Sequence, residues 1–393
     1  MDFPDIHSFN QIYDCIVIGA GIEGSSTAYR SAKLGYKTLL LEQFCLPHSR
    51  GSSHGPSRLI RFAHSKMRYA EMMPEMYDVW NRLEEESNTK LFQKTGLLIV
   101  GRPSNNVVAE RVKVLKAMKT PYEELTHPQG LQRHLPDATF GPDAIGCIDK
   151  MALVVRADKC LKCFQDQFVA HGGILHDEEK VLEILPGTLV TVVTNKGKYR
   201  AKSVAITAGP WSSKLLNPIG LEPPIKVWRV NVCFFKERSI GTYSKWPVFI
   251  DSTDSGFVCG FPSNDYPGYM KMGYHHLWKE VDPDERDYKI HGESQVDIEF
   301  LKKYVRRHFP GLEAEPAIVE TCMYTCTPTE EIIIDRHPVY SNIVYACGLS
   351  GQGFKLAPIV GKMLCEMAYG KQTSYDITPF TLKSLLARSK SKL

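Results

Sequence analysis

Three glycines near the start of the chain have the spacing of a loop that lets a phosphate group approach the backbone. They are Gly19, Gly21 and Gly24 in the stretch IGAGIEG, and an acid, Glu42, follows eighteen residues after the third. In a dinucleotide site the first glycine permits the tight turn, the second admits the pyrophosphate and the third lets the helix pack on the strand, while the acid binds the ribose hydroxyls. These residue types in this order predict a dinucleotide site. The alternative is a chance glycine turn.

The elements that must position this loop are readable on either side of it. Residues 13–18, YDCIVI, form a short apolar run that predicts a strand, and small and apolar residues at helical spacing follow the glycines. A second apolar run, KTLLLEQ, predicts the next strand and includes Glu42 near its end. The helix between the strands directs its first amide groups at a phosphate. This pattern alone does not separate NAD from FAD.

Two later stretches indicate one long ligand that is contacted from both ends of the chain. The run KSVAITAGPW predicts a strand that leads into Gly209, and residues 342–370 predict a strand, a loop with Gly351 and Gly353, and a helix. The stretch HSRGSSHGPSRLIR follows the second strand, where an NAD domain would continue with another helix. For the loop at Gly351 the alternative is a plain turn between strand and helix.

Composition excludes several classes of function. The chain has 393 residues, of which 43% are hydrophobic and 23% charged, with a net charge of +4. No block of like charges is present to follow a nucleic-acid backbone, and no apolar run is long enough to cross a membrane, so we expect neither partner. The eleven cysteines form no framework, which favours reduced thiols. The CxxC pair Cys160 and Cys163 lies in a predicted helix capped by Asp158, so we expect a helix-face role and no metal.

The last three residues are Ser391-Lys392-Leu393, a tripeptide that the peroxisomal import receptor reads at a C-terminus. We expect this receptor as a partner and the peroxisome as the location. The alternative is a frayed basic tail. The stretch before the tripeptide, LARSK, is basic, and we expect residues 386–393 to form a flexible tail.

Later motifs carry a resemblance to a known family. The combination of VIGAGIEGSS, HGPSRLIR, MKMGYH, TCMYTCTPTEEIIID and GLSGQGFK resembles the sarcosine oxidase family of amine-oxidising flavoproteins, roughly from Tyr13 to Ile377. The resemblance implies an α/β plus α+β fold, a Rossmann-type FAD-binding domain with a mixed-sheet substrate domain. We expect residues 8–90, 150–220 and 320–385 in the first domain, and residues 91–149 and 221–319 in the second. We expect a monomer.

The resemblance also implies an FAD that is attached covalently to a cysteine sulfur. The family's cysteine falls on Cys322 in the segment CMYT. A thiolate there must attack an electron-poor methyl carbon of the flavin, which a cationic neighbourhood would favour. Cys326 follows four residues later, and residue chemistry alone does not choose between the two. A merely buried thiol is the alternative for Cys322.

Family members oxidise small secondary amino acids, whose carboxylate requires a cationic site. The family's pair of cations falls on Arg61, in SRLIR, and Lys355, in GQGFK. A guanidinium matches a carboxylate with two hydrogen bonds, and an ammonium supplies a point charge on the other side. The alternatives are a surface ion pair for Arg61 and an exposed first-turn lysine for Lys355.

The resemblance to the family implies four further residues as catalytic candidates. Arg58 matches an arginine beside the flavin ring, and His54 matches a histidine of the same loop. Lys271 in MKMGYH matches a lysine that is thought to speed the reaction with oxygen, since a fixed positive charge stabilises developing superoxide. His275 matches an active-site histidine, for which a place in the pocket is favoured over a role as base. Positions 271 and 275 share one face of a strand.

One position departs from the bacterial members of the family. They carry a tyrosine just before the GFPS turn, where this chain has Cys259. A smaller side chain leaves room for a ring in the substrate, so we expect L-pipecolate and L-proline as substrates beside sarcosine. The expected reaction is flavin-dependent oxidation of such amino acids to the imine, with O2 reduced to hydrogen peroxide. The alternatives are a dehydrogenase with a protein acceptor, an NAD-dependent dehydrogenase and a flavin-fold protein without turnover.

Overall fold

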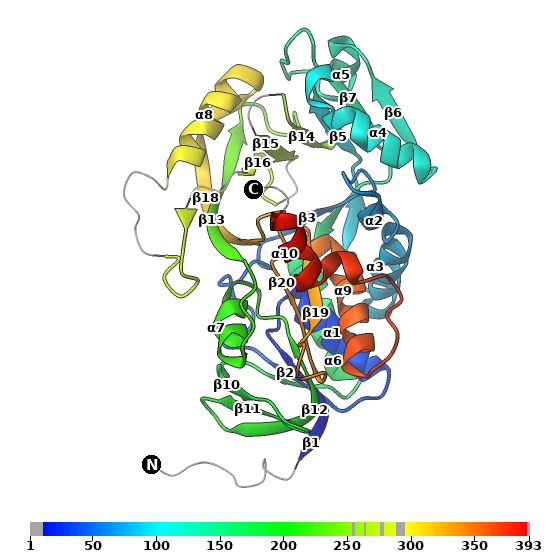
Figure 1. The fold of residues 1–393 in the computed structure, drawn as a ribbon. Coiled ribbons are helices and arrows are strands. Elements are labelled where there is room, and N and C mark those ends of the chain that lie inside the picture. Colours follow the sequence, from blue (N-terminus) through cyan, green and yellow to red (C-terminus); the bar gives the residue numbers. More distant parts are fainter. Residues whose placement is uncertain (1–10, 254–255, 263–264, 276–278, 288–294, 391–393) are drawn as a thin grey trace.

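The computed structural model describes residues 11–253, 256–262, 265–275, 279–287 and 295–390. An eight-stranded sheet forms the lower half of the molecule in Figure 1, with five parallel strands in the order β20-β12-β1-β2-β9. The antiparallel strands β10, β11 and β19 extend it. The strands of this sheet are β1 (Ile12–Ile18), β2 (Thr38–Leu41), β9 (Ile174–His176), β10 (Val181–Leu185), β11 (Val190–Thr194), β12 (Lys198–Ile206), β19 (Ile333–Arg336) and β20 (Ile343–Cys347).

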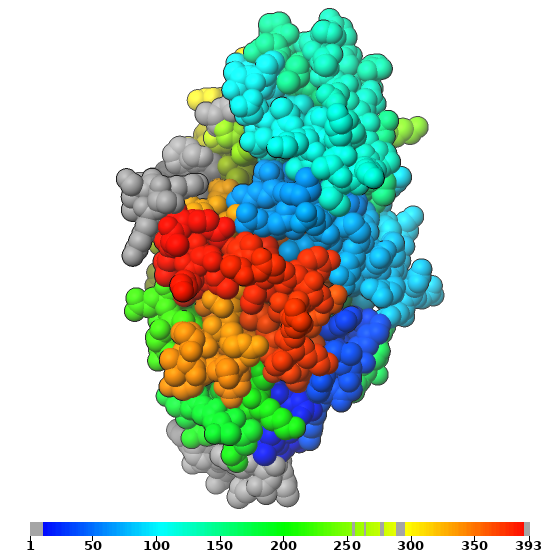
Figure 2. Space-filling view, turned by 45° about the vertical axis from the view of Figure 1, so that its right-hand side comes forward, coloured from blue at the N-terminus to red at the C-terminus, as the bar shows by residue number. Residues whose placement is uncertain are grey.

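Four helices share a hydrophobic core with this sheet: α1 (Ile22–Lys33), α3 (Met73–Ser87), α6 (Ala157–Ala170) and α9 (Gly353–Ala368). The helices α1 and α9 come from opposite ends of the chain and pack directly on each other. A Cβ atom at Gly361 would lie only 2.8 Å from the backbone nitrogen of Thr27, so a larger residue would push the two helices apart. Figure 2 shows the first and last quarters of the sequence side by side. The two glycine loops that precede these helices are thereby held close together.

The upper half contains a nine-stranded sheet in the order β17-β13-β16-β15-β14-β5-β7-β6, with β18 also paired to β13. The sheet is mixed, because β14 and β5 run parallel and the other pairs are antiparallel. Its strands are β5 (Leu97–Gly101), β6 (Tyr122–Leu125), β7 (Ile145–Asp149), β13 (Lys226–Glu237), β14 (Val248–Asp251), β15 (Phe257–Phe261), β16 (Tyr269–His275), β17 (Lys279–Glu280) and β18 (Leu312–Cys326). The helices α4 (Val107–Ala117), α5 (Pro128–His134) and α8 (Val296–His308) lie around it (Figure 1).

A three-stranded sheet connects the two halves. Its strands are β3 (Ser57–Ile60), β8 (Leu153–Arg156) and β4 (Phe92–Lys94), so it takes strands from segments predicted for both domains. The domain boundaries themselves stay a prediction. The remaining short elements are α2 (Met67–Ala70), α7 (Ser212–Leu216), η2 (Pro103–Asn105), η3 (Gly209–Trp211), η4 (Asn217–Ile219) and η6 (Thr378–Phe380).

The expectation of a flexible segment from residue 386 onward is wrong for residues 386–390. They continue the helix α10 (Leu382–Lys390). Leu385 is fully buried in the core of the parallel sheet, and Asp335 accepts a hydrogen bond from the backbone nitrogen of Leu382 at 2.9 Å. These two contacts fix the start of the helix. The predicted targeting tripeptide, residues 391–393, lies outside the described residues.

The CxxC pair lies on α6, with both thiols buried in the core. The predicted cap at Asp158 is wrong, because the helix begins at Ala157 without a side-chain cap and Asp158 lies in its first turn beside Arg156. Within the described ranges, no group of three or more His, Cys, Asp or Glu side chains is placed to hold a metal ion. No helix in that part of the chain is long and apolar enough to cross a membrane.

Candidate functional site

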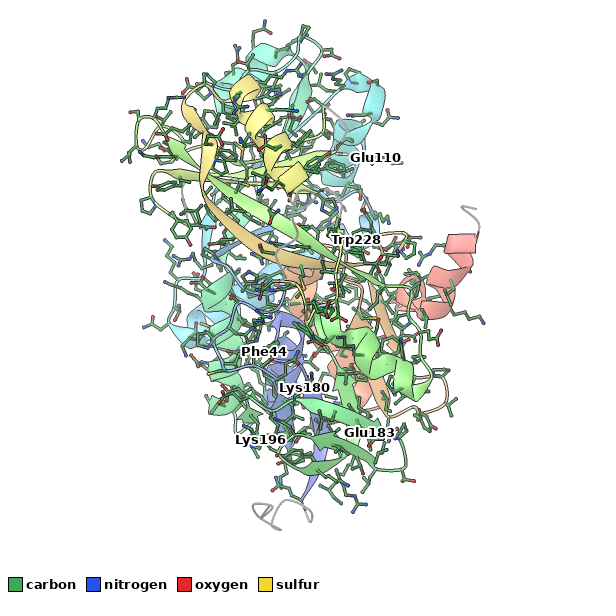
Figure 3. The ribbon with its side chains drawn as sticks, turned by 90° about the vertical axis from the view of Figure 1, so that its left-hand side faces the viewer. Phe44, Glu110, Lys180, Glu183, Lys196 and Trp228 are labelled. Atoms are coloured by element: carbon green, nitrogen blue, oxygen red, sulfur yellow. The ribbon has the colours of Figure 1, made fainter. Side chains whose placement is uncertain are left out.

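A cavity of about 1800 Å³ runs between the two sheets and is lined by both glycine loops. Pockets for small ligands are roughly 300 to 1000 Å³, so this cavity has room for a dinucleotide and a substrate. Glu110 and Lys180 both line it, and they lie at well separated levels of the molecule in Figure 3. The cavity therefore extends from α4 in the upper half to the edge of the parallel sheet in the lower half.

The first glycine loop has the conformation that its sequence predicts. Gly19 has a φ of +97°, which favours glycine. A Cβ atom on Gly24 would lie 1.8 Å from the carbonyl oxygen of Gly19, so only glycine lets α1 start so close to β1. Gly19 and Gly21 line the cavity, and Gly21 is the N-cap residue of α1, which therefore has no side-chain cap. The helix start is built to receive an anion.

Glu42 lies buried beside the same loop. Its carboxylate accepts hydrogen bonds from the backbone nitrogens of Ala20, at 2.9 Å, and Phe44, at 3.1 Å. His48 lies 3.3 Å away through its Nε2. Glu42 also lines the cavity, where its remaining lone pairs can accept from ribose hydroxyls. Glu42 thus has a structural role in the loop, and its place on the cavity wall is compatible with the predicted role in ligand binding.

The second glycine loop forms another wall of the cavity. Gly209, Gly351 and Gly353 all line it, and Gly209 and Gly351 have positive φ values of +51° and +73°. A Cβ atom on Gly353 would lie 2.4 Å from Oε1 of Glu23. The start of α9 therefore lies directly against the start of α1.

Arg61 and Lys355 line the cavity together. Arg61 is not part of a surface ion pair with a described residue, and Lys355 is not an exposed lysine, although it lies in the first turn of α9. Lys355 is buried, with only 9% of its surface exposed, and it donates to the carbonyl oxygen of Gly351 at 2.9 Å and to Oε1 of Gln352 at 2.8 Å. The guanidinium of Arg61 makes no ion pair with any described residue, and its Nε has no hydrogen-bond partner there. Burial lowers the pKa of Arg61 to about 10 and that of Lys355 well below its usual value. The positive charge of Arg111 lowers the pKa of Arg61 further, and that of Arg61 lowers the pKa of Lys355 further. Two cations without an acidic partner form a site for an anion.

Arg58 and His54 hold the loop that follows β2. Arg58 donates to the carbonyl oxygens of Ser52, His54 and Ser57 at 2.7 to 3.0 Å, and its guanidinium lies 5.8 Å from the ring of Phe354. His54 contacts the carbonyl oxygen of Gly51 through Nδ1 at 2.6 Å, and burial lowers its pKa. Both side chains line the cavity. Their contacts shape the cavity wall at this loop.

Lys271 and His275 both line the cavity from β16, as their shared strand face predicts. Lys271 donates to Oδ2 of Asp265 at 3.0 Å and to Oγ of Ser57 at 2.9 Å. The imidazole of His275 lies 5.2 Å from the ring of Tyr324, with its Nε2 3.9 Å from Oε1 of Glu330.

The two cysteines of β18 differ in their surroundings. Cys322 lines the cavity, with its Sγ 4.0 Å from the carbonyl oxygen of Ser52 in the neighbouring loop. Cys326 lies deeper, and burial together with the charge of Glu330 raises its pKa to about 12. Geometry thus favours Cys322 for contact with a ligand in the cavity. Cys259 lines the cavity as well, beside Arg61 and Lys355.

Sequence reasoning missed three polar residues of this site. Glu23 lines the cavity from the first turn of α1, and burial raises its pKa to about 7. Arg111 lines it from α4, bonded to Glu110 at 2.9 Å. Asp265 binds Lys271 from the turn between β15 and β16. The turn FPSNDYPGY has an acid six residues before Lys271, and this spacing was a signal for Asp265. Residues 263–264 of this turn lie outside the described residues.

Comparison with known proteins agrees with this geometry. The chain matches the model of the FAD dependent oxidoreductase family, DAO, over residues 14–367, and it belongs to that family. It is 44% identical to peroxisomal sarcosine oxidase of Homo sapiens, with 97% of this chain and 98% of the relative covered. It is 33% identical to monomeric sarcosine oxidase of Bacillus sp. (strain NS-129), with 94% and 96% covered. The protein is therefore an FAD-dependent, sarcosine oxidase-like amine oxidase that oxidises sarcosine-type amino acids.

Solved structures confirm the predicted fold. NikD, described as an unusual amino acid oxidase essential for nikkomycin biosynthesis, superposes with a TM-score of 0.83 at 21% identity, with 95% of this chain and 98% of NikD covered. L-proline dehydrogenase from P. horikoshii superposes with a TM-score of 0.79 at 19% identity, with 96% and 99% covered. The fit of FAD rests on the cavity itself, because its volume, its two uncapped glycine-rich helix starts and the close approach at Gly24 match a long pyrophosphate ligand.

Proposed function

We propose that the protein oxidises sarcosine and L-pipecolate, and L-proline more weakly, and that O2 is reduced to hydrogen peroxide. The observation that carries the proposal is the pair of cavity-lining cations Arg61 and Lys355, which bind no carboxylate of the described chain. An uncompensated buried charge is costly, and the carboxylate of an amino acid supplies the missing partner. The amine is thereby oriented toward the middle of the cavity.

In this reaction Arg61 and Lys355 bind the substrate, and Lys271 supplies a positive charge. The two glycine loops and Glu42 would hold FAD, which would supply the two-electron oxidation of the carbon next to the amine nitrogen and the reduction of O2. Arg61 and Lys355 fix the carboxylate, so the amine and its neighbouring carbon take one orientation. Lys271 supplies a positive charge on another wall of the cavity, where negative charge develops on oxygen. Water hydrolyses the imine product, and no dedicated base is required of His275.

Cys259 supports the wider choice of substrate. It lies beside both cations and is smaller than the tyrosine of the bacterial relatives, which leaves space next to the amine for a ring. A methylene group that fits a pocket is worth about 1 to 3 kcal/mol of discrimination. The ring of L-pipecolate is therefore accepted along with the methyl group of sarcosine.

The experiment that tests the substrate class is anaerobic bleaching of the flavin by sarcosine, L-pipecolate, L-proline, N-methyltryptophan, dimethylglycine and alanine. We expect fast bleaching by the first two, slower bleaching by L-proline and almost none by alanine. Fast bleaching by dimethylglycine or alanine, with none by sarcosine or L-pipecolate, would contradict the proposal. A peroxide assay during turnover in air separates an oxidase from a dehydrogenase that uses a protein acceptor.

We also propose that FAD is attached covalently to Cys322, which lines the cavity beside the loop that contains Ser52. Acid-precipitated protein should retain the yellow flavin, and Cys322→Ser should release it. The matched control is Cys326→Ser on the same strand, which should retain the flavin. If the flavin leaves in the Cys326 variant and stays in the Cys322 variant, the assignment is wrong.

The location that we propose is the peroxisome, reached through the import receptor that reads Ser391-Lys392-Leu393. Two relatives at 44% identity, from Homo sapiens and Mus musculus, are named peroxisomal. A reporter fused before the last twelve residues tests the signal, with Leu393 deleted as control.

A further inference from the structure

A buried ion pair on the wall of the cavity is not explained by substrate binding. Lys271 on β16 and Asp265 in the turn before it lie 3.0 Å apart, with their side chains only 11% and 2% exposed. Ser57 of β3 completes the cluster, because its Oγ donates to the same Oδ2 of Asp265 at 2.9 Å and accepts from Nζ of Lys271 at 2.9 Å. The three side chains form a closed triangle of hydrogen bonds.

The triangle fixes the ammonium group in space as well as neutralising it. Ser57 belongs to the strand that continues into Arg58, and Lys271 also lies within 3.5 Å of the carbonyl oxygen of Ser57. The rings of Phe261 and Phe234 lie 5.5 and 5.9 Å from Nζ and occupy the space around it. A lysine side chain with four rotatable bonds is thereby held in one position against β3.

Several charges act on the pKa of Lys271. Burial lowers it and is the largest effect; Asp265 raises it, Arg58 lowers it and Glu320 raises it. Glu320, on β18, accepts a hydrogen bond from Tyr266 at 2.8 Å, so it belongs to the same wall. Asp265 is thus the strongest influence that keeps the buried lysine charged.

We propose that Asp265 is a positioning residue for the oxygen reaction, which holds the Lys271 ammonium charged and fixed against β3 where it faces the cavity. The inference rests on the proposed function, in which Lys271 supplies positive charge to developing superoxide. Asp265 supports this role indirectly and contacts neither substrate nor oxygen. Because Lys271 must be protonated, reoxidation is fast below its pKa and slows as the pH rises through it.

The sharpest variant is Asp265→Asn, which removes the charge and keeps the shape. Oδ1 of Asp265 has no hydrogen-bond partner among the described residues, so the amide nitrogen can take that position while the amide oxygen still accepts from Ser57 and Lys271. Loss of an opposite charge at this distance lowers the pKa of the lysine by about 1 to 3 units. The pH at which reoxidation of the reduced flavin slows should fall by the same amount, and reduction by sarcosine should keep its rate. Asp265→Glu keeps the negative charge, so the pH at which reoxidation slows should lie between those of Asp265→Asn and the parent.

A second measurement reads the lysine directly. Competitive acetylation of the full-length, flavin-loaded protein with acetic anhydride across a pH series, followed by peptide mass spectrometry, reports the pKa of Lys271. Asp265→Asn should lower it, so that Lys271 reacts at lower pH than in the parent. The matched control is Asp251→Asn, a buried carboxylate of the same sheet that binds Tyr304 at 2.7 Å. It should leave the acetylation profile of Lys271 unchanged.

The outcomes separate the inference from the proposal beneath it. If Lys271→Met leaves reoxidation as fast as in the parent, the oxygen role of Lys271 fails and the inference fails with it. If Lys271→Met slows reoxidation while Asp265→Asn shifts neither the pH profile nor the acetylation profile, the oxygen role stands and the inference is wrong. Equal slowing of flavin reduction and reoxidation in Asp265→Asn, without a pH shift, would also overturn it, because that result describes general damage to the site.

Discussion

Two buried lysines face the same cavity and differ in the partners that the chain provides. Lys271 and Lys355 are each 9% exposed. Lys271 binds the carboxylate of Asp265, whereas Lys355 binds a backbone carbonyl oxygen and an amide oxygen. Among the charges that act on Lys355, the largest is the like charge of Arg61. One lysine is compensated within the protein and the other is not.

The difference indicates what each charge is for. A buried cation with its own carboxylate stays charged through every step of a reaction, which suits a fixed electrostatic role such as the oxygen step. A buried cation without one is poorly stable as an ion, and it gains most when an anion arrives from solution. The unequal pairing thus agrees with the proposed roles, substrate binding for Arg61 and Lys355 and a permanent positive charge for Lys271.

The largest expected effect comes from removing the first cation of the substrate site. Arg61→Ala should weaken the binding of sarcosine by about 2 to 5 kcal/mol, because the substrate carboxylate then enters a buried site with one partner missing. The dissociation constant comes from the dependence of anaerobic flavin reduction on sarcosine concentration. The matched control is Arg156→Ala, which removes a partly buried arginine of β8 that pairs with Asp158. An undiminished affinity in Arg61→Ala would break the contrast between the two lysine sites.

The sequence could predict the parts of this molecule that depend on local chemistry. The loop at Gly19, Gly21 and Gly24 was recognisable because each glycine answers a local steric demand, and the flanking strand and helix follow from apolar spacing. The resemblance then placed Arg61 and Lys355, which the structure brings together on one cavity. The helix at residues 386–390 was missed because its stability comes from the burial of Leu385, a tertiary contact.

Asp265 shows why the rest of the site was not predictable. Its turn could be recognised from Asn, Asp, Pro and Gly, but its contact with Ser57 joins residues more than two hundred positions apart. Such a contact depends on how the mixed sheet sits on β3, and no local pattern encodes it. The contact of Asp265 with Ser57 and the lack of an acidic partner for Lys355 therefore emerged only from the packed structure.

The weakest effect that we predict is the uptake of a proton by Lys355 when a carboxylate binds. Burial and Arg61 hold the pKa of Lys355 well below its usual value before substrate binds, and an arriving carboxylate raises it again. Above the lowered pKa the lysine is neutral, so binding of a carboxylate takes up a proton, and affinity falls by about tenfold for each pH unit, or about 1.4 kcal/mol.

Calorimetry of acetate binding in two buffers with different heats of ionisation measures this uptake, since acetate carries the carboxylate and cannot be oxidised. We expect a net uptake that disappears in Lys355→Met and persists in Lys271→Met, because Asp265 already keeps Lys271 charged before the anion arrives. If instead the uptake persists in Lys355→Met and disappears in Lys271→Met, then Lys271 is the cation that responds to the substrate. The roles assigned to the two lysines would then have to be exchanged.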